Sequence, residues 1–299
     1  GVANATVTMN AASMENSGFE FSATYRNHDH PFKYDISANL STLRNRVTSL
    51  GFGTESYITG AYATYVGKEI GKFYGWVYEG IARTQSDLDN HATQQGANVG
   101  DCLYKDISGP NGEPDGVIDA YDQTVLGSGL AKMNFGLSAH MEYKGFDLSI
   151  STYGALNYHV ADDIYNSLNS CYGWGNKDVA MADANRFSED GSTYLSNVPR
   201  TYVDNKGTLA WNDLFSSRKI QNAAYWKIAN VELGYNFPDR WFKGLVTGVR
   251  AYVSAQNLYT FTGYKGYNVD YAGGTFTPGY NFCSFPSARS FMAGLHFTF

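Results

Sequence analysis

The twenty residues from Met133 to Thr152, MNFGLSAHMEYKGFDLSIST, decide the fold of this chain. Apolar and polar side chains alternate on both sides of the dipeptide Lys144-Gly145, which leaves room only for a tight turn. Successive side chains of a β-strand point to opposite faces. One face therefore carries Met133, Phe135, Leu137, Ala139, Met141, Tyr143, Phe146, Leu148, Ile150 and Thr152, and the other carries Asn134, Gly136, Ser138, His140, Glu142, Asp147, Ser149 and Ser151. The pattern predicts an antiparallel hairpin with one apolar and one polar face.

The same alternation recurs in other segments of the chain. It covers residues 18–26, 32–42, 229–237, 249–256 and 289–299, and the polar residues 27–31 join the first two segments into a second hairpin. A tilted strand needs roughly 9–11 residues to cross a bilayer, and polar faces of this kind are tolerated against a water-filled lumen but not against lipid. Aromatic residues gather at strand ends, as in the girdles of membrane barrels: Tyr25, Tyr143, Phe146, Tyr235, Phe237, Tyr259 and Phe261.

The connections between these segments are of two very different lengths. Lys144-Gly145 and residues 238–245 are short, whereas residues 77–132, 157–217 and 264–288 are long. Compact soluble domains rarely contain such long connections, but outer-membrane barrels combine short periplasmic turns with long extracellular loops. The sequence therefore predicts seven or eight strands of a transmembrane β-barrel, with one or two more between Ser56 and Trp76.

The amino-acid composition is consistent with strands that have one face toward lipid and the other toward water. Aromatic residues make up 16% of the chain and charged residues 17%, below the roughly 25% of soluble domains, yet the mean hydropathy is −0.34. A soluble β-sandwich binding module shares much of this composition and stays open as an alternative.

The net charge of −6, with no basic run, argues against a nucleic-acid partner. No stretch approaches the roughly 18 apolar residues of a spanning helix.

The cysteines and the first residues of the chain give little information about its function. Cys102, Cys171 and Cys283 show no metal-type spacing, and an odd number cannot all pair, so no disulfide is expected. The chain begins at Gly1 without a charged and apolar leader, so a secretory signal is expected to have been removed or to lie outside this chain.

Several longer stretches resemble the SusC/RagA family of TonB-dependent transporters from Bacteroidetes. The clearest are NSGFEF at 16–21, GKEIGKFYGW at 67–76, YWKIANVELGY at 225–235, VSAQNLYTFT at 253–262 and FPSAR at 285–289. Further matches fall at residues 78–81, 100–106, 115–122, 126–127 and 264–267, in family order. The last residues, GLHFTF at 294–299, also resemble the terminal sorting signal of outer-membrane barrels, although Met292 stands where that signal often has a polar residue.

This resemblance implies a fold and a function for the whole protein. The chain is similar to the C-terminal third of a 22-stranded barrel, so residues 1–299 are expected to be part of one barrel domain without the plug and N-terminal domains. The implied activity is import of oligosaccharides or peptides across the outer membrane, with a SusD-like surface lipoprotein and TonB as partners. An outer-membrane adhesin or enzyme of another class remains an alternative.

One acidic loop is a candidate metal site. Residues 115–122, DGVIDAYD, resemble the second half of a Ca²⁺-binding loop, in which oxygen donors alternate around a glycine. The predicted ligands are Asp106, Asp115, Asp119 and Asp122 with the carbonyl of Val117. The spacing from Asp106 to Asp115 exceeds that of a standard loop, so an Asp/Gly-rich turn that binds its own backbone is the alternative. No cofactor is expected to be required.

Candidate substrate contacts are aromatic residues in the long loops. Flat rings stack on sugars or contact peptide side chains without needing charge. The predicted contacts are Tyr172, Trp174, Trp211, Tyr264 and Tyr267, and packing of the loops against one another is the alternative for each. No catalytic residues are expected: the six histidines form no metal pattern, and the sequence contains no Gly-x-Ser-x-Gly nucleophile motif.

Overall fold

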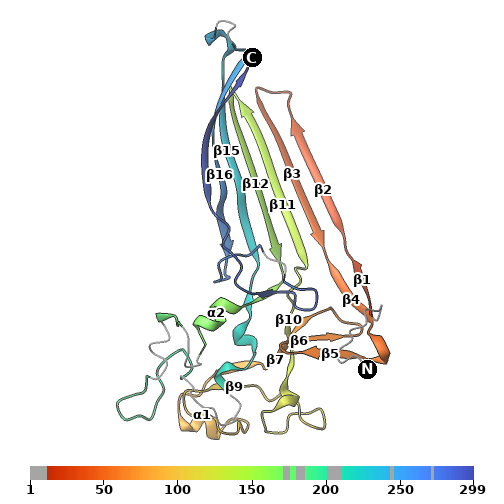
Figure 1. Cartoon of the computed structure of the whole chain (residues 1–299), viewed down its shortest axis with the longest axis vertical. Helices are drawn as coiled ribbons and strands as arrows, with labels where there is room; N and C mark the ends of the chain where they lie inside the picture. Colours follow the sequence, from red (N-terminus) through yellow and green to blue (C-terminus); the bar gives the residue numbers. More distant parts are fainter. Residues whose placement is uncertain (1–11, 171–175, 180–185, 201–210, 243–245, 271–272) are drawn as a thin grey trace, which may run out of the picture.

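The computed structural model describes residues 12–170, 176–179, 186–200, 211–242, 246–270 and 273–299 of the 299-residue chain. Its largest element is one antiparallel sheet of seven long strands, which we call the wall (Figure 1). In spatial order the strands are β18 (Ser290–Thr298), β16 (Gly248–Thr262), β15 (Tyr225–Phe237), β12 (Phe146–Leu156), β11 (Met133–Tyr143), β3 (Phe32–Thr42) and β2 (Glu20–Asn27).

The hairpin expected from residues 133–152 is confirmed. Strands β11 and β12 pair without interruption from Tyr143 opposite Phe146 to Met133 opposite Leu156. The second hairpin, β2 with β3, is confirmed as well, and β11 pairs with β3 over its whole length. We call the end of the sheet with residues 28–31, 144–145, 238–242 and 246–247 the turn end, and the opposite end the loop end.

The described strands form an open sheet and not a closed barrel, because β2 and β18 each have a strand neighbour on one side only. Many large apolar side chains of the sheet are exposed, so the other described elements leave them uncovered. Phe21 is 62% exposed, Phe291 71% and Leu295 63%, and the exposed apolar residues of the wall come from all seven strands. An uncovered apolar face of this extent marks a surface that meets another apolar phase or another protein surface.

The loop end carries several small sheets of its own (Figure 1). Strands β1 (Ser13–Ser17) and β4 (Arg44–Ser49) prolong the β2–β3 hairpin, and β8 (Tyr78–Ile81) pairs with β9 (Cys102–Tyr104). The strands expected between Ser56 and Trp76 are present, but they belong to a separate four-stranded sheet and not to the wall. That sheet contains β5 (Ser56–Thr59), β6 (Tyr62–Tyr65), β7 (Lys72–Gly75) and β10 (Thr124–Gly127).

The remaining elements are short. A three-stranded sheet joins β14 (Gln221–Asn222), β13 (His159–Asp162) and β17 (Tyr280–Asn281). The helices are α1 (Gln85–Asp89) and α2 (Asp163–Leu168), with 3-10 turns η1 (Gly51–Gly53), η2 (Ala120–Asp122), η4 (Trp211–Asp213), η5 (Ser217–Lys219) and η6 (Asp239–Trp241). Within the described residues, no helix combines the length and apolar character needed to span a bilayer.

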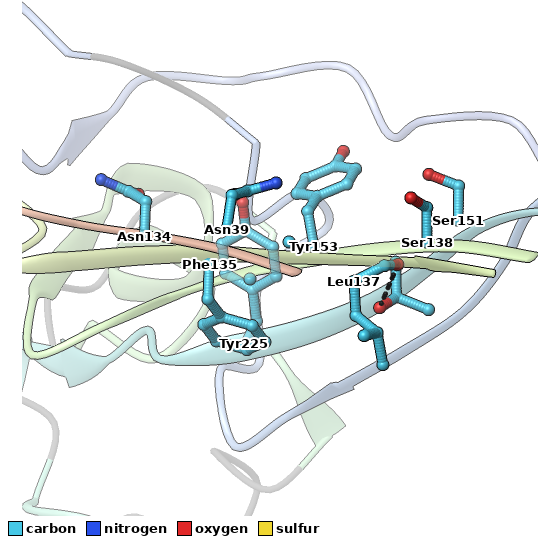
Figure 2. Close-up of a pocket in the computed structure, with 11 residues that line it drawn as sticks. Asn39, Asn134, Phe135, Leu137, Ser138, Ser151, Tyr153 and Tyr225 are labelled. Carbon is cyan, nitrogen blue, oxygen red and sulfur yellow. Dashed lines mark hydrogen bonds between the residues drawn. The ribbon is translucent and has the colours of Figure 1, made fainter. Parts of the chain in front are cut away.

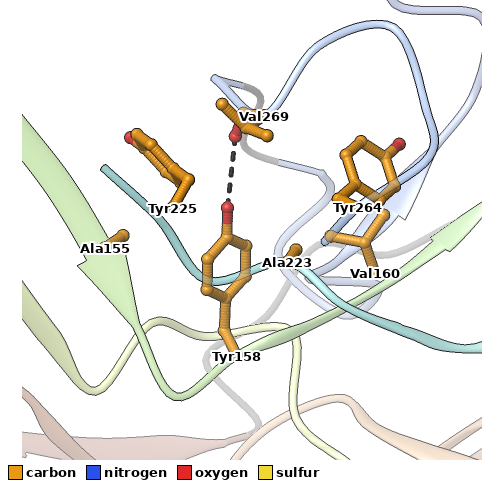
Figure 3. Packing of buried hydrophobic residues seen from close by; sticks show 7 residues of the cluster. All are labelled: Ala155, Tyr158, Val160, Ala223, Tyr225, Tyr264 and Val269. Carbon is orange, nitrogen blue, oxygen red and sulfur yellow. Dashed lines mark hydrogen bonds between the residues drawn. The ribbon is translucent and has the colours of Figure 1, made fainter. Parts of the chain in front are cut away.

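The buried cores of the described residues lie at the loop end rather than within the wall. The cluster in Figure 3 joins the end of the wall to the connection between β12 and β15 and to that between β16 and β18, through Ala155, Tyr158, Val160, Ala223, Tyr225, Tyr264 and Val269. The hydroxyl of Tyr158 donates to the carbonyl of Val269 over 3.2 Å. Burial raises the pKa of the Tyr158 and Tyr264 phenols, so both remain neutral donors.

A second cluster contains Cys102, Tyr104, Ile118 and Trp211. Cys102 is buried in it and Cys283 is exposed, whereas Cys171 lies outside the described residues.

Candidate functional site

The polar face of the wall carries a shallow hollow. It has a volume of about 380 Å³ and lies where β3, β11 and β12 pass side by side, around Gly136. Polar residues of its lining include Asn39, Asn134, Ser138, Ser151 and Tyr153. Figure 2 shows these side chains on one side of the strands and that of Leu137 on the other. Gly136 keeps the hollow open, because a Cβ there would lie 2.7 Å from the Asn39 amide nitrogen.

No charged residue lines this hollow. Amides and hydroxyls both donate and accept hydrogen bonds, and the Tyr153 ring adds a flat apolar surface. The arrangement can bind neutral polar groups such as sugar hydroxyls or peptide amides. It offers no nucleophile with an adjacent base.

Toward the turn end the polar face becomes charged. Arg250 on β16 bonds Asp147 on β12 through Nε at 3.0 Å and Nη2 at 2.5 Å, and its Nη2 also bonds Glu232 on β15 at 2.7 Å. Asn236 donates to Asp147 over 3.0 Å. Asp147 is buried, so these bonds compensate the cost of removing its charge from water. This cluster locks three neighbouring strands in register.

At the loop end a connection crosses the polar face. Asp270, from the segment between β16 and β18, accepts from Lys227 on β15 at 2.5 Å and from the Tyr153 hydroxyl at 3.1 Å. The same segment reaches β5, where the rings of Phe276 and Tyr57 lie 6.2 Å apart, and β13, where Tyr280 pairs with Ala161. This segment therefore narrows the polar face next to the hollow.

The five aromatic residues predicted to contact substrate differ in their burial, and two of them lie outside the described residues. Tyr172 and Trp174 lie outside the described residues. Trp211 is buried and donates through Nε1 to the carbonyl of Gln95 at 3.0 Å. Tyr264 is buried and bonds Asp162 and Asn281. Neither of these two rings presents a face to a ligand in this conformation, and their role as substrate contacts remains a prediction.

Tyr267 is the exception. It is 63% exposed and lines a second hollow, of about 310 Å³, together with Lys227, Asn268 and Arg289. Of the five predicted aromatics, it is the one that the described structure leaves accessible. Asn39, Asn134 and Tyr153 could not be predicted as site residues from the sequence, because only the register between strands brings them together.

The acidic loop is organised by hydrogen bonds to its own backbone. Asp122 is fully buried and accepts from the N–H groups of Ile107, Ser108 and Asp119 at 2.7, 3.2 and 2.8 Å. Asp119 accepts from Tyr121 at 2.7 Å. Asp115 accepts from Val117 at 3.0 Å, and Asp106 from Gly116 at 2.7 Å. Within the described residues, no three acidic, histidine or cysteine groups are placed to hold a metal ion. Calcium binding stays a prediction.

Replacing Asp122 by Ala is expected to loosen this loop by about 1–3 kcal/mol, because three backbone N–H groups of half-buried residues lose their acceptor. Hydrogen exchange of residues 106–122 measures the effect, and Asp115→Ala, which frees one exposed donor, is the milder control. Calcium binding would appear as slower exchange in the unmodified loop on addition of Ca²⁺ and faster exchange with a chelator. An unchanged exchange rate in both would contradict it.

Curated proteins with sequences similar to this chain are TonB-dependent receptors. No protein-family model matches the chain. The TonB-dependent receptor P3 of Formosa agariphila is 29% identical over 310 residues, covering 97% of this chain and 29% of that receptor. The TonB-dependent receptor SusC of Bacteroides thetaiotaomicron is 27% identical over 311 residues, covering 99% of this chain and 27% of SusC.

Solved structures match the fold. A structure of the RagAB peptide transporter superposes with a TM-score of 0.74 at 21% identity, covering 97% of this chain and 29% of the matched chain. The RagAB peptide importer in the closed-closed state gives 0.74 at 22% identity, with 97% and 30% coverage. These relatives are receptors and a transporter rather than enzymes. The chain is a homologue of the TonB-dependent receptors that include SusC, and it spans less than a third of their length.

Proposed function

We propose that this chain forms part of the wall and the extracellular loops of an outer-membrane importer that is energised through TonB. The observation that carries the proposal is the seven-stranded sheet with an uncovered apolar face and a polar, hollowed opposite face. Such a sheet is stable where one face meets lipid and the other meets water. Homology to TonB-dependent receptors supports the coupling to TonB.

The complete protein is proposed to be a 22-stranded barrel of which this chain is the C-terminal part. The free edges of β2 and β18 would pair with strands outside this chain, since an open strand edge cannot face hydrocarbon. The loop end would then be extracellular and the turn end periplasmic. A SusD-like lipoprotein would cover the loop end, and TonB would act through a segment outside this chain. The likeness to SusC and to RagAB supports this assembly.

The substrate is proposed to be an oligosaccharide or a peptide that passes along the polar face. The hollow around Gly136 offers amide and hydroxyl groups with the rings of Tyr153 and Tyr225, and Tyr267 adds an accessible ring nearer the outside. Neutral polar ligands of both classes are bound by groups of this kind.

Filling the hollow tests this function. Ser138 is exposed on the polar face, opposite Ser151 and Ser37. Ser138→Trp in the complete receptor is expected to lower substrate uptake on the order of tenfold, equivalent to about 1.4 kcal/mol, because the indole occupies space that a passing ligand needs. Uptake of labelled oligosaccharide and peptide mixtures by cells, with and without TonB, measures the effect.

The neighbouring residue provides the control. Ala139→Trp places the same ring on the apolar face, where an aromatic side chain is tolerated in lipid, so uptake should stay near the unmodified level. Equal uptake by both variants would contradict the role of the polar face. TonB-independent uptake by the unmodified receptor would contradict the proposed energy coupling.

A further inference from the structure

A pocket outside the polar face is lined by an unusual number of hydrogen-bond donors. It has a volume of about 440 Å³ and lies at the loop end, where α2, η5 and β14 meet the ends of β15 and β16. Its lining residues are Tyr165, Arg218, Gln221, Asn222, Ala224, Gly263 and Lys265. We call it the rim pocket.

Two cations line the rim pocket without an acidic partner in the part of the chain that the structure describes. Other half-buried or buried cations among the described residues are paired, such as Lys219 with Asp213 at 2.9 Å and Lys227 with Asp270 at 2.5 Å. Among the described residues, neither Arg218 nor Lys265 has a carboxylate within ion-pair distance. The ammonium of Lys265 lies 5.9 Å from the centre of the Tyr165 ring. Lys265 is exposed and Arg218 half-buried, so both charges are accessible.

The two amides of the lining add further donors. The Oε1 of Gln221 accepts from the backbone N–H of Lys265 at 2.9 Å, and the Oδ1 of Asn222 accepts from that of Ala224 at 2.9 Å. Both amide oxygens are therefore occupied and both NH₂ groups remain. The Nε2 of Gln221 is buried and has no acceptor within the described structure. An unsatisfied buried donor costs free energy until an acceptor arrives.

These four groups define the chemistry of the ligand. Arginine, lysine and two amide NH₂ groups donate hydrogen bonds, and no carboxylate lies in the lining. A small anion with several acceptor oxygens is the group that satisfies them together, and guanidinium binds phosphate through paired donors.

The position of the rim pocket indicates the source of that anion. Trp226 on β15 and Phe261 on β16 stack on the apolar face, with ring centres 5.2 Å apart, and both are exposed. Ala224 and Gly263, in the pocket lining, come two residues beyond them toward the loop end. Aromatic girdles of this kind lie at the level where hydrocarbon gives way to headgroups. The rim pocket is thus at headgroup height.

We propose that the rim pocket binds a phosphate group of an anionic lipid in the outer leaflet, with Arg218 and Lys265 supplying the charge and the amides of Gln221 and Asn222 the additional donors. The proposal rests on the proposed outer-membrane function, because that function places lipid against the apolar face. Binding would tether the loop end to the membrane surface next to β15 and β16.

The test uses the complete receptor that contains this chain, in nanodiscs of phosphatidylcholine with a minor fraction of lipid A. Native mass spectrometry counts the lipid A molecules that stay bound. The double variant Arg218→Gln, Lys265→Gln is expected to bind lipid A about 25-fold more weakly, since each of the two basic residues near an anionic headgroup contributes on the order of a factor of five. Arg218→Lys, which keeps the charge but loses the paired donors, should give a smaller loss.

The matched control removes two charges elsewhere at the loop end. Lys68 and Lys105 are exposed and form no ion pair within the described residues, so Lys68→Gln, Lys105→Gln should retain lipid A as the unmodified receptor does. Lipid A without its phosphate groups should bind the unmodified receptor and the Arg218/Lys265 double variant equally weakly. Equal retention of lipid A by the Arg218/Lys265 double variant and by the Lys68/Lys105 double variant would overturn the proposal.

Two further readouts separate other outcomes. Inorganic phosphate at millimolar concentration should not displace lipid A; full displacement, with phosphate protecting the receptor against thermal unfolding, would indicate a soluble anion as ligand and overturn the lipid assignment. Receptor that does not insert into nanodiscs or shows no heat-modifiable band would instead contradict the proposed function. The two failures are therefore distinguishable.

Discussion

Replacing Val253 by Arg is expected to destabilise the wall by about 2–4 kcal/mol. Val253 lies near the middle of β16, on the apolar face opposite Leu233 and Ala293, and is 54% exposed. If this face meets hydrocarbon, an arginine there must bring its charge into lipid or distort the bilayer around it. The free energy of unfolding of the complete receptor in lipid vesicles, from denaturant titration, measures the effect.

A residue on the other face of the same strand is the control. Gln256 is exposed and follows the alternation that places Ser254 and Arg250 on the polar face. Gln256→Arg should change stability by no more than about 0.5 kcal/mol, as expected for a solvated position. Equal tolerance of arginine at both positions would show that the apolar face does not meet lipid.

The substitution Gly129→Ala is expected to cost about 3 kcal/mol through overpacking between two connections at the loop end. A Cβ on Gly129 would lie 2.0 Å from the carbonyl oxygen of Pro278 and 2.4 Å from the nitrogen of Gly279. These are backbone atoms, so no side chain can rotate away. The hydrogen bond from Ala161 to the Gly279 carbonyl, 2.9 Å, would be lost with the displacement.

Thermal unfolding and limited proteolysis of residues 264–288 measure this effect. Gly263→Ala is the matched control, because a Cβ there meets no atom within 4 Å and the backbone conformation suits any residue. The control should leave proteolysis unchanged. If Gly129→Ala also leaves it unchanged, the segment between β16 and β18 does not pack against residues 128–130 as described.

The long strands were predictable because each carries its own signal. In β11 and β12 the alternation of apolar and polar residues, with Lys144-Gly145 between them, specifies strand, faces and register together. The acidic loop shows where such reasoning was incomplete. The spacing of Asp115, Asp119 and Asp122 allows both a metal site and a backbone-capping turn, and the hydrogen bonds made by Asp122 come from residues 107 and 108 as well as 119.

Aromatic residues in the long connections could not be assigned from their spacing. Trp211, Tyr264 and Tyr267 look alike in the sequence, yet the first two are buried and the third is exposed. The difference depends on partners far away in the chain: Trp211 packs with Tyr104, and Tyr264 bonds Asp162. A ring in a loop has no periodic neighbours that reveal which side is covered.

By itself the sequence determined a two-faced wall of long antiparallel strands and the division into short and long connections, because period-two alternation is a local property of each strand. Only the tertiary structure decided that β12 pairs with β15, that Gly136 opens a hollow between Asn39 and Tyr153, and that Arg218 and Lys265 share one pocket. Those juxtapositions depend on how long connections pack, and packing between distant segments leaves no repeating pattern in the chain.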